Sequence, residues 1–158
     1  MNFHISDIFF LIGKWKGSGY AQFPTIEPVE YNEEMNFSSN LTDAVLFYEQ
    51  RSWISSGDNA GMPIYWESGF IIHEGENQFS LSNSQKSGRV EVCRGKISND
   101  QNSWKLTFEN EMTSDARLER ITREYIFNND ELSYKLNMKM KSVEKHQNHL
   151  RAFLKKER

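Results

Sequence analysis

The stretch from Gly13 to Glu34 constrains the fold of this chain more than any other. With the two-residue period of a β-strand, one face of its first part carries Gly13, Trp15, Gly17 and Gly19. Glycine weakens the interior of a strand and packs nothing, so three glycines on one face are wrong for an ordinary strand. They indicate a sharp bend, or a large group lying close to the backbone, with the tryptophan filling the space between them.

Strand-like segments and turn-forming residues alternate along the rest of the chain. Pro24 and Pro28 exclude a helix after the first strand, because the residue before each proline is pushed to extended geometry. We predict strands at 13–20, 29–37, 44–55, 63–74, 78–84, 88–97, 103–112, 118–127, 132–141 and 149–156, with turns between them that include 98–100. The strand from Leu132 alternates most regularly between apolar and polar residues.

Regular spacing and short turns predict an all-β protein, and the number of strands selects its architecture. About ten consecutive antiparallel strands favour a closed up-and-down β-barrel, similar in shape to lipocalins and fatty-acid-binding proteins, because closure removes exposed edges. Such a barrel has an interior wider than its own side chains fill, which predicts a ligand cavity. Before the first strand, residues 8–12 are all apolar, so we predict a short buried helical plug capped by Ser6 or Asp7 and ended by Gly13.

Composition excludes several other classes of protein. The 158 residues predict one domain, 1–158, and a net charge of -3 argues against a nucleic-acid partner. A single cysteine, Cys93, suits a reducing compartment, and no apolar run has membrane-spanning length. The start of the chain lacks the features of a signal peptide, so we predict a cytoplasmic protein with no membrane partner. No metalloprotease, P-loop or serine-hydrolase motif is present, so no side chain is assigned a catalytic role.

Three motifs in the first part of the chain carry a family resemblance. They are G-x-W-x-G-x-G at 13–19, P-T-I-E-P at 24–28 and Y-x-E-E at 31–34. In this order and spacing they resemble the nitrobindin family, haem-binding β-barrels related in shape to fatty-acid-binding proteins. The resemblance implies a ferric b-type haem at the barrel mouth, a ligand such as nitric oxide or peroxynitrite, and isomerisation of peroxynitrite to nitrate. We expect a monomer or a weak homodimer.

A second motif lies near the end of the chain, where H-L-x-A-x-L at 149–154 resembles the C-terminal signature of the same family. The resemblance implies that His149 is the axial ligand of the haem iron. Strict alternation with Leu150 facing inward turns His149 outward, so it reaches iron only from before the strand or across a β-bulge. His146 is the rival ligand, and an exposed histidine at a strand start is the structural alternative.

The resemblance also implies that Thr25 lies against the haem; the alternative is a turn residue that bonds its own backbone. Where the family commonly has a histidine in H-x-E-x-G-F, this chain has Tyr65. Its phenol can donate to an iron-bound ligand or bind ferric iron as phenolate, or it can simply line the mouth. Met138, with Met140, is expected to line the cavity and pack on a flat macrocycle.

Charged residues on inward faces support a second hypothesis. Glu67 shares a face with Tyr65 and is predicted to pair with Arg51 or Arg123. One of those arginines, or Arg151, on an inward face would suit a carboxylate. The alternative function is therefore a haem-free carrier of a fatty acid or other hydrophobic amphiphile. A third reading is a barrel that binds nothing specific.

Overall fold

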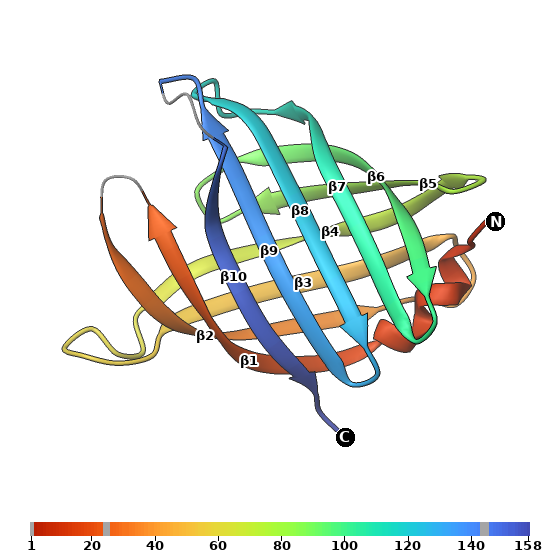
Figure 1. Cartoon of the computed structure of the whole chain (residues 1–158), viewed down its shortest axis with the longest axis horizontal. Helices are drawn as coiled ribbons and strands as arrows, with labels where there is room; N and C mark the ends of the chain where they lie inside the picture. Colours follow the sequence, from red (N-terminus) through yellow and green to blue (C-terminus); the bar gives the residue numbers. More distant parts are fainter. Residues whose placement is uncertain (1, 24–25, 143–145) are drawn as a thin grey trace.

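Ten antiparallel strands close into a barrel in the computed structural model, which describes residues 2–23, 26–142 and 146–158 (Figure 1). The strands are β1 (Gly13–Phe23), β2 (Ile26–Ser38), β3 (Val45–Ile54), β4 (Pro63–Gly75), β5 (Gln78–Gln85), β6 (Val90–Asp100), β7 (Ser103–Thr113), β8 (Leu118–Asn128), β9 (Glu131–Met140) and β10 (Gln147–Lys156). Each strand pairs with its neighbours in sequence, and β1 pairs with β10 to close the ring. The predicted up-and-down β-barrel is confirmed.

Most predicted strand boundaries lie within three residues of the observed ones, but the turn predicted at 98–100 is wrong. Strand β6 continues to Asp100, whose partner in β7 is Ser103. The turn consists of the next two residues, where Gln101 takes the left-handed conformation with a φ of 58°. Pairing with β7 therefore overrides the turn preference of the Ser-Asn-Asp sequence.

Two glycines of β1 allow the neighbouring strands to approach closely, including β10 at the seam where the barrel closes. A Cβ atom at Gly17 would lie 1.8 Å from the carbonyl oxygen of Phe153 in β10. At Gly19 it would lie 2.5 Å from the ring of Tyr31, the residue opposite it in β2. Only glycine fits at these two positions. The predicted close approach of a large group to this face is therefore present.

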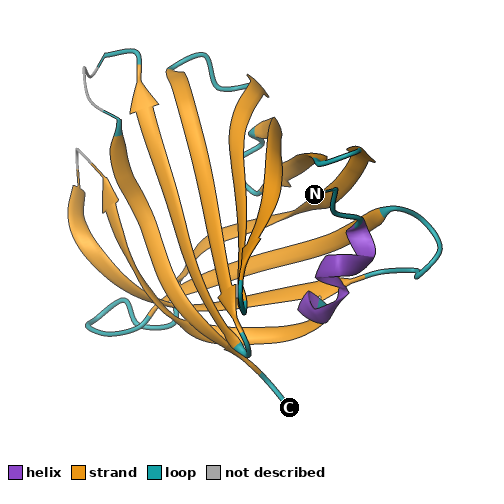
Figure 2. Cartoon of the chain, turned by 45° about the vertical axis from the view of Figure 1, so that its right-hand side comes forward, coloured by secondary structure: helices purple, strands orange, loops and turns teal. Residues whose placement is uncertain are grey.

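A short 3₁₀-helix, η1 (Ile5–Leu11), lies at one end of the barrel beside the start of β1 (Figure 2). The indole of Trp15 donates to the carbonyl of Leu11 at 2.9 Å, and three apolar side chains of the helix are buried. The N-cap is His4, which was not predicted and whose side chain accepts from the amide of Ser6, while Ile12 ends the helix. The predicted Asp7 takes part in the cap, because its side chain accepts from the amide of His4 at 2.8 Å. Within the described residues, no helix is long and apolar enough to cross a membrane.

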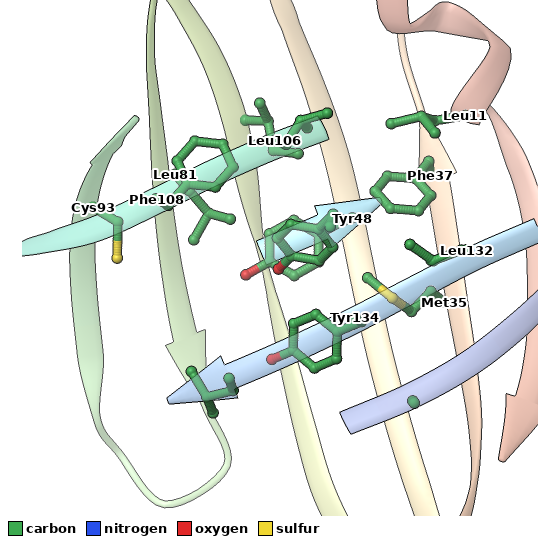
Figure 3. Packing of buried hydrophobic residues seen from close by; sticks show 14 of the residues in the cluster. Leu11, Met35, Phe37, Tyr48, Leu81, Cys93, Leu106, Phe108, Leu132 and Tyr134 are labelled. Atoms are coloured by element: carbon green, nitrogen blue, oxygen red, sulfur yellow. The ribbon is translucent and has the colours of Figure 1, made fainter. Parts of the chain in front are cut away.

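The half of the barrel nearest η1 is filled by its own side chains. Phe37, Tyr48, Leu106 and Leu132 point into this region together with Leu11 (Figure 3). Each strand residue lies toward the end of its strand that is nearest η1. The predicted plug therefore closes a packed core, and the open part of the interior lies at the far end.

Candidate functional site

A cavity of about 480 Å³ occupies the end of the barrel away from η1. Its walls come from the last residues of β1, β3, β5 and β9, the first residues of β2, β4, β8 and β10, and the connections that follow β5, β7 and β9. Its lining residues are Ala21, Tyr31, Ser52, Ile64, Tyr65, Gln85, Lys86, Ser87, Arg89, Asp115, Arg117, Leu118, Leu136, Met138, Met140, Ser142, His149 and Leu150. Most of the cavity surface is apolar, as expected of a small-molecule site.

A β-bulge in β10 turns His149 into this cavity. The pairing of β10 with β9 shifts between Asn148, opposite Asn137, and Leu150, opposite Leu136. His149 and Leu150 are consequently both buried although they are consecutive in a strand, and both line the cavity. This is one of the two routes that the sequence left open for an inward histidine. The rest of β10 alternates regularly between inward and outward residues.

The amide side chain of Asn148 holds the bulge in place. Its nitrogen donates to the carbonyl of Leu150 at 3.1 Å and to the side-chain oxygen of Asn137 at 3.0 Å. The first bond spans the bulged residue, and the second ties the same side chain to β9. Asn148 therefore fixes the backbone on both sides of His149, and it was not identified from the sequence.

The surroundings of His149 favour a neutral imidazole. The ring is 4% exposed, and burial lowers its pKa, as do the nearby charges of Arg89 and His146. A neutral imidazole has a nitrogen lone pair, which is the form that binds a metal ion. His149 is thus chemically ready to act as a ligand.

The rival histidine lies elsewhere. Nε2 of His146 is 2.8 Å from the hydroxyl oxygen of Thr122, whose neighbours Ile121 and Arg123 are the inward residues of β8. His146 is absent from the cavity lining. Of the two histidines, only His149 faces the cavity.

Tyr65 and Gln85 form the wall across the barrel from His149. Around the ring, β10 and β5 are five strands apart in either direction, and β4, which carries Tyr65, is next to β5. Ser52, opposite Tyr65 in β3, belongs to the same wall. A flat ligand between the walls would have the imidazole on one face and the phenol on the other.

The hydroxyl of Tyr65 donates to the carboxylate of Glu67, which belongs to a buried polar network. Glu67 also accepts from Tyr48, from Asn83 at 3.1 Å and from Arg123 at 3.1 and 3.2 Å. Burial, followed by the charge of Glu67, raises the pKa of Tyr65 well above its ordinary value of 10. The phenolate form considered from the sequence is therefore strongly disfavoured here.

Of the two predicted partners of Glu67, Arg123 is the one that pairs with it, and Arg123 also has a second carboxylate partner. Its guanidinium lies 2.8 Å from Glu91, whose other oxygen is 3.0 Å from Arg89 at the cavity wall. Arg123, Glu67 and Glu91 are fully buried, and the network pairs two carboxylates with two guanidinium groups. It begins and ends at the cavity, at Tyr65 and Arg89.

None of the three arginines considered for a carboxylate ligand lines the cavity. Arg123 is already paired twice. Arg51 is exposed, pairs with Glu49 and lies over the ring of Trp66. Arg151 is also exposed and lies over Tyr20. The three arginines considered from the sequence therefore do not supply a carboxylate site in this cavity.

Met138 and Thr25 are the remaining predicted site residues. Met138 is buried and lines the cavity together with Met140. Thr25 lies outside the described residues. Three basic residues at the cavity mouth were not identified from the sequence: Lys86, Arg89, which pairs with Glu91, and Arg117, which pairs with Asp115. A basic side chain in a turn after an inward-facing strand end, as in Gln85 to Arg89, was the available signal.

Haem fits this set of side chains. A buried, neutral imidazole can bind iron, while Leu136 and Met138 provide apolar surface for a macrocycle. Lys86 at the mouth suits one of its carboxylate groups, whereas Arg89 and Arg117 already pair with Glu91 and Asp115. The residues that would hold the cofactor therefore occupy one cavity with the required chemistry.

The fold and the cavity define a class of protein: a closed antiparallel β-barrel that takes a small-molecule ligand at one end. Within this class the lining side chains decide what is bound. The chain belongs to the family described as "THAP4-like, heme-binding beta-barrel domain", whose model matches residues 4–156. The resemblance to nitrobindin and the prediction of haem with iron as cofactor are confirmed at the level of the family.

Relatives with known names or structures agree with this family. The chain is 30% identical over 153 residues to an Arabidopsis thaliana protein named peroxynitrite isomerase Rv2717c, covering 96% of this chain and 88% of that protein. It is 26% identical over 93 residues to a ferric nitrobindin-like protein of Streptomyces coelicolor, covering 58% of this chain and 48% of that protein. The crystal structure of Rv2717c from M. tuberculosis superposes with a TM-score of 0.87 at 28% identity, covering 98% of this chain and 97% of that one.

Proposed function

We propose that this protein binds ferric b-type haem through His149 and converts peroxynitrite to nitrate. The observation that carries the proposal is the bulge at His149, which puts a neutral imidazole into a largely apolar cavity. Relatives named peroxynitrite isomerase supply the reaction. Peroxynitrite and nitrate are isomers, so the conversion needs no further reactant. Bound haem supplies a ferric centre that binds nitric oxide or peroxynitrite.

The side chains of the cavity would have separate tasks. His149 would bind the iron of the cofactor, and Asn148 would keep the imidazole in position. Leu136, Met138 and Leu150 exclude water from the ring. Tyr65 would face the ligand from the opposite wall, and Lys86 would attract anions to the mouth. We further propose a cytoplasmic protein that is monomeric or weakly dimeric.

Haemin titration of the pure apoprotein tests this function. We expect a Soret band that saturates at one haemin per chain in the wild type. His149→Gly should lose it and regain it when imidazole is added, because free imidazole replaces the missing ligand. His146→Ala is the matched control and should load like the wild type. Unchanged haemin affinity in His149→Gly without imidazole would refute the assignment.

The isomerase activity is measured separately. Stopped-flow decay of peroxynitrite should be faster with the haem-loaded wild type than with the apoprotein, and the product should be nitrate with little nitrite. His149→Gly without imidazole should behave like the apoprotein. A loaded protein that leaves the decay rate unchanged would retain haem binding but contradict the reaction.

A further inference from the structure

The hydroxyl group of Tyr65 has a single proton, and that proton is directed away from the cavity. The phenol donates to Oε1 of Glu67, which lies two residues along the same strand and is fully buried. Oε1 also accepts from Arg123 at 3.2 Å. A carboxylate paired with a guanidinium can only accept hydrogen bonds, so the direction of the Tyr65 bond is determined.

The other donors around Glu67 reinforce this direction. Tyr48 donates to Oε2, and Asn83 and Arg123 each donate to the same oxygen at 3.1 Å. Each of these side chains is buried, so the arrangement is shielded from water. Reversal of the Tyr65 bond would place two unprotonated acceptors against each other, or would require a protonated Glu67 beside Arg123.

Gln85, next to Tyr65 on the cavity wall, follows the same pattern. Its amide nitrogen donates to the side-chain oxygen of Asn83 at 3.4 Å, and the nitrogen of Asn83 donates onward to Glu67. Donors on this wall therefore point into the barrel core. Ser52 is the third polar residue of the wall, and its hydroxyl can rotate to either role.

We propose that Tyr65 is a hydrogen-bond acceptor toward the ligand in this cavity and selects ligands that present an N–H or O–H group to it. The lone pairs of its oxygen are what remains for the cavity once its proton is bonded to Glu67. Where the ligand is bound to iron, this inference rests on the proposed function and names the chemical class that the cavity favours: protonated, neutral ligands, such as peroxynitrous acid, over bare anions. Tyr65 is thus a specificity-determining residue.

Ligand titrations of the ferric haem-loaded protein test the proposal by absorbance. Azide is a bare anion, whereas imidazole bound through one nitrogen presents its N–H to the opposite wall. We expect Tyr65→Phe to bind azide roughly 3- to 10-fold more tightly and imidazole 3- to 10-fold more weakly than the wild type, the size of one hydrogen bond. Arg89 is unchanged in both proteins, so its charge cancels in the comparison.

Tyr134→Phe is the matched control. Tyr134 is a fully buried tyrosine of the same interior, and it does not line the cavity. The azide and imidazole affinities of this variant should equal those of the wild type. Weaker azide binding in Tyr65→Phe would show that the phenol donates to the ligand, and unchanged affinities would show that it makes no bond. Either result overturns the proposal.

A measurement on the apoprotein needs no iron. Indole and benzofuran have nearly the same shape, but only indole has an N–H group. Calorimetry on the wild-type apoprotein should show indole binding several-fold more tightly, and Tyr65→Phe should abolish the difference. Equal or tighter binding of benzofuran by the wild type overturns the acceptor role. Because failure to bind haemin leaves this result unaffected, the proposed function and the role of Tyr65 are judged separately.

Discussion

The side-chain amide of Asn148 donates to the backbone carbonyl of Leu150 at 3.1 Å, across the bulged residue His149. The two groups belong to residues that flank the bulge, so their bond fixes the backbone that carries the imidazole. The same amide nitrogen reaches Asn137 on the neighbouring strand. The direction of His149 therefore depends on one asparagine that makes no contact with a ligand itself.

Asn148→Asp should weaken haemin binding about 10-fold, because it keeps the shape of the side chain but removes the donor that holds the bulge. Asn137→Ala is the control: it removes the side-chain contact to β9 and leaves the bond to Leu150. We expect a much smaller effect from it. Haemin titration followed by Soret absorbance measures both. Equal losses in the two variants would assign the effect to strand pairing instead of the bulge.

Glu33 should make stability fall as pH rises. It is fully buried, and burial raises its pKa from an ordinary 4.5 to about 8, opposed by a hydrogen bond from Gln50. Between pH 4.5 and about 8 the folded state holds a proton on Glu33 that the unfolded state releases. The stabilisation of the folded state by this proton is complete below pH 4.5 and is lost as the pH rises through about 8. In this pH range the free energy of unfolding of the wild type should fall by about 1.4 kcal/mol per pH unit relative to that of Glu33→Gln, whose side chain is neutral throughout. Urea unfolding at several pH values measures this, and a constant difference would refute it.

Arg123→Met should be strongly destabilising, because Glu67 and Glu91 would remain buried without their shared partner. Loss of one member of a buried ion pair costs roughly 3–5 kcal/mol. Arg94→Met breaks an exposed pair with Glu111 and should cost about 0–1 kcal/mol. Urea unfolding of both variants supplies the comparison. Similar small losses would mean that the buried network contributes little to folding.

Gly19→Ala should destabilise the barrel by about 1–3 kcal/mol, since the added methyl group would overlap the ring of Tyr31 and the carbonyl of Arg151. Ser18→Ala, at the adjacent exposed position, is the control and should be nearly neutral. Thermal and urea unfolding measure both. A neutral Gly19→Ala would indicate that the seam between β1 and β10 is looser than the structure shows.

The strands could be predicted from the sequence because alternation and turn residues are local signals. Ser98 to Asp100 is the exception, since three turn-forming residues continue a strand there when β7 provides partners. The N-cap residue of the helix was missed for a related reason: His4 is an uncommon cap, and its role depends on the position of its ring nitrogen near Ser6.

The site could be predicted only in part. The histidine was found from its motif, but its direction depends on a register shift against β9, which no local pattern encodes. The pairing of Glu67 with Arg123 was one of two options, and the choice required knowledge of which side chains meet across the barrel. Glu91 was missed, although an acidic residue on the same face as Cys93 signals a buried partner.

The strand that carries His149 is also the one that seals the ring, since β10 pairs with both β9 and β1. It is the last of the ten strands to leave the ribosome. A nascent chain therefore has neither the imidazole nor a complete wall around its ligand until synthesis of the barrel is almost finished. Cofactor capture would then follow barrel closure, and a chain that stalled before β10 would sequester no iron.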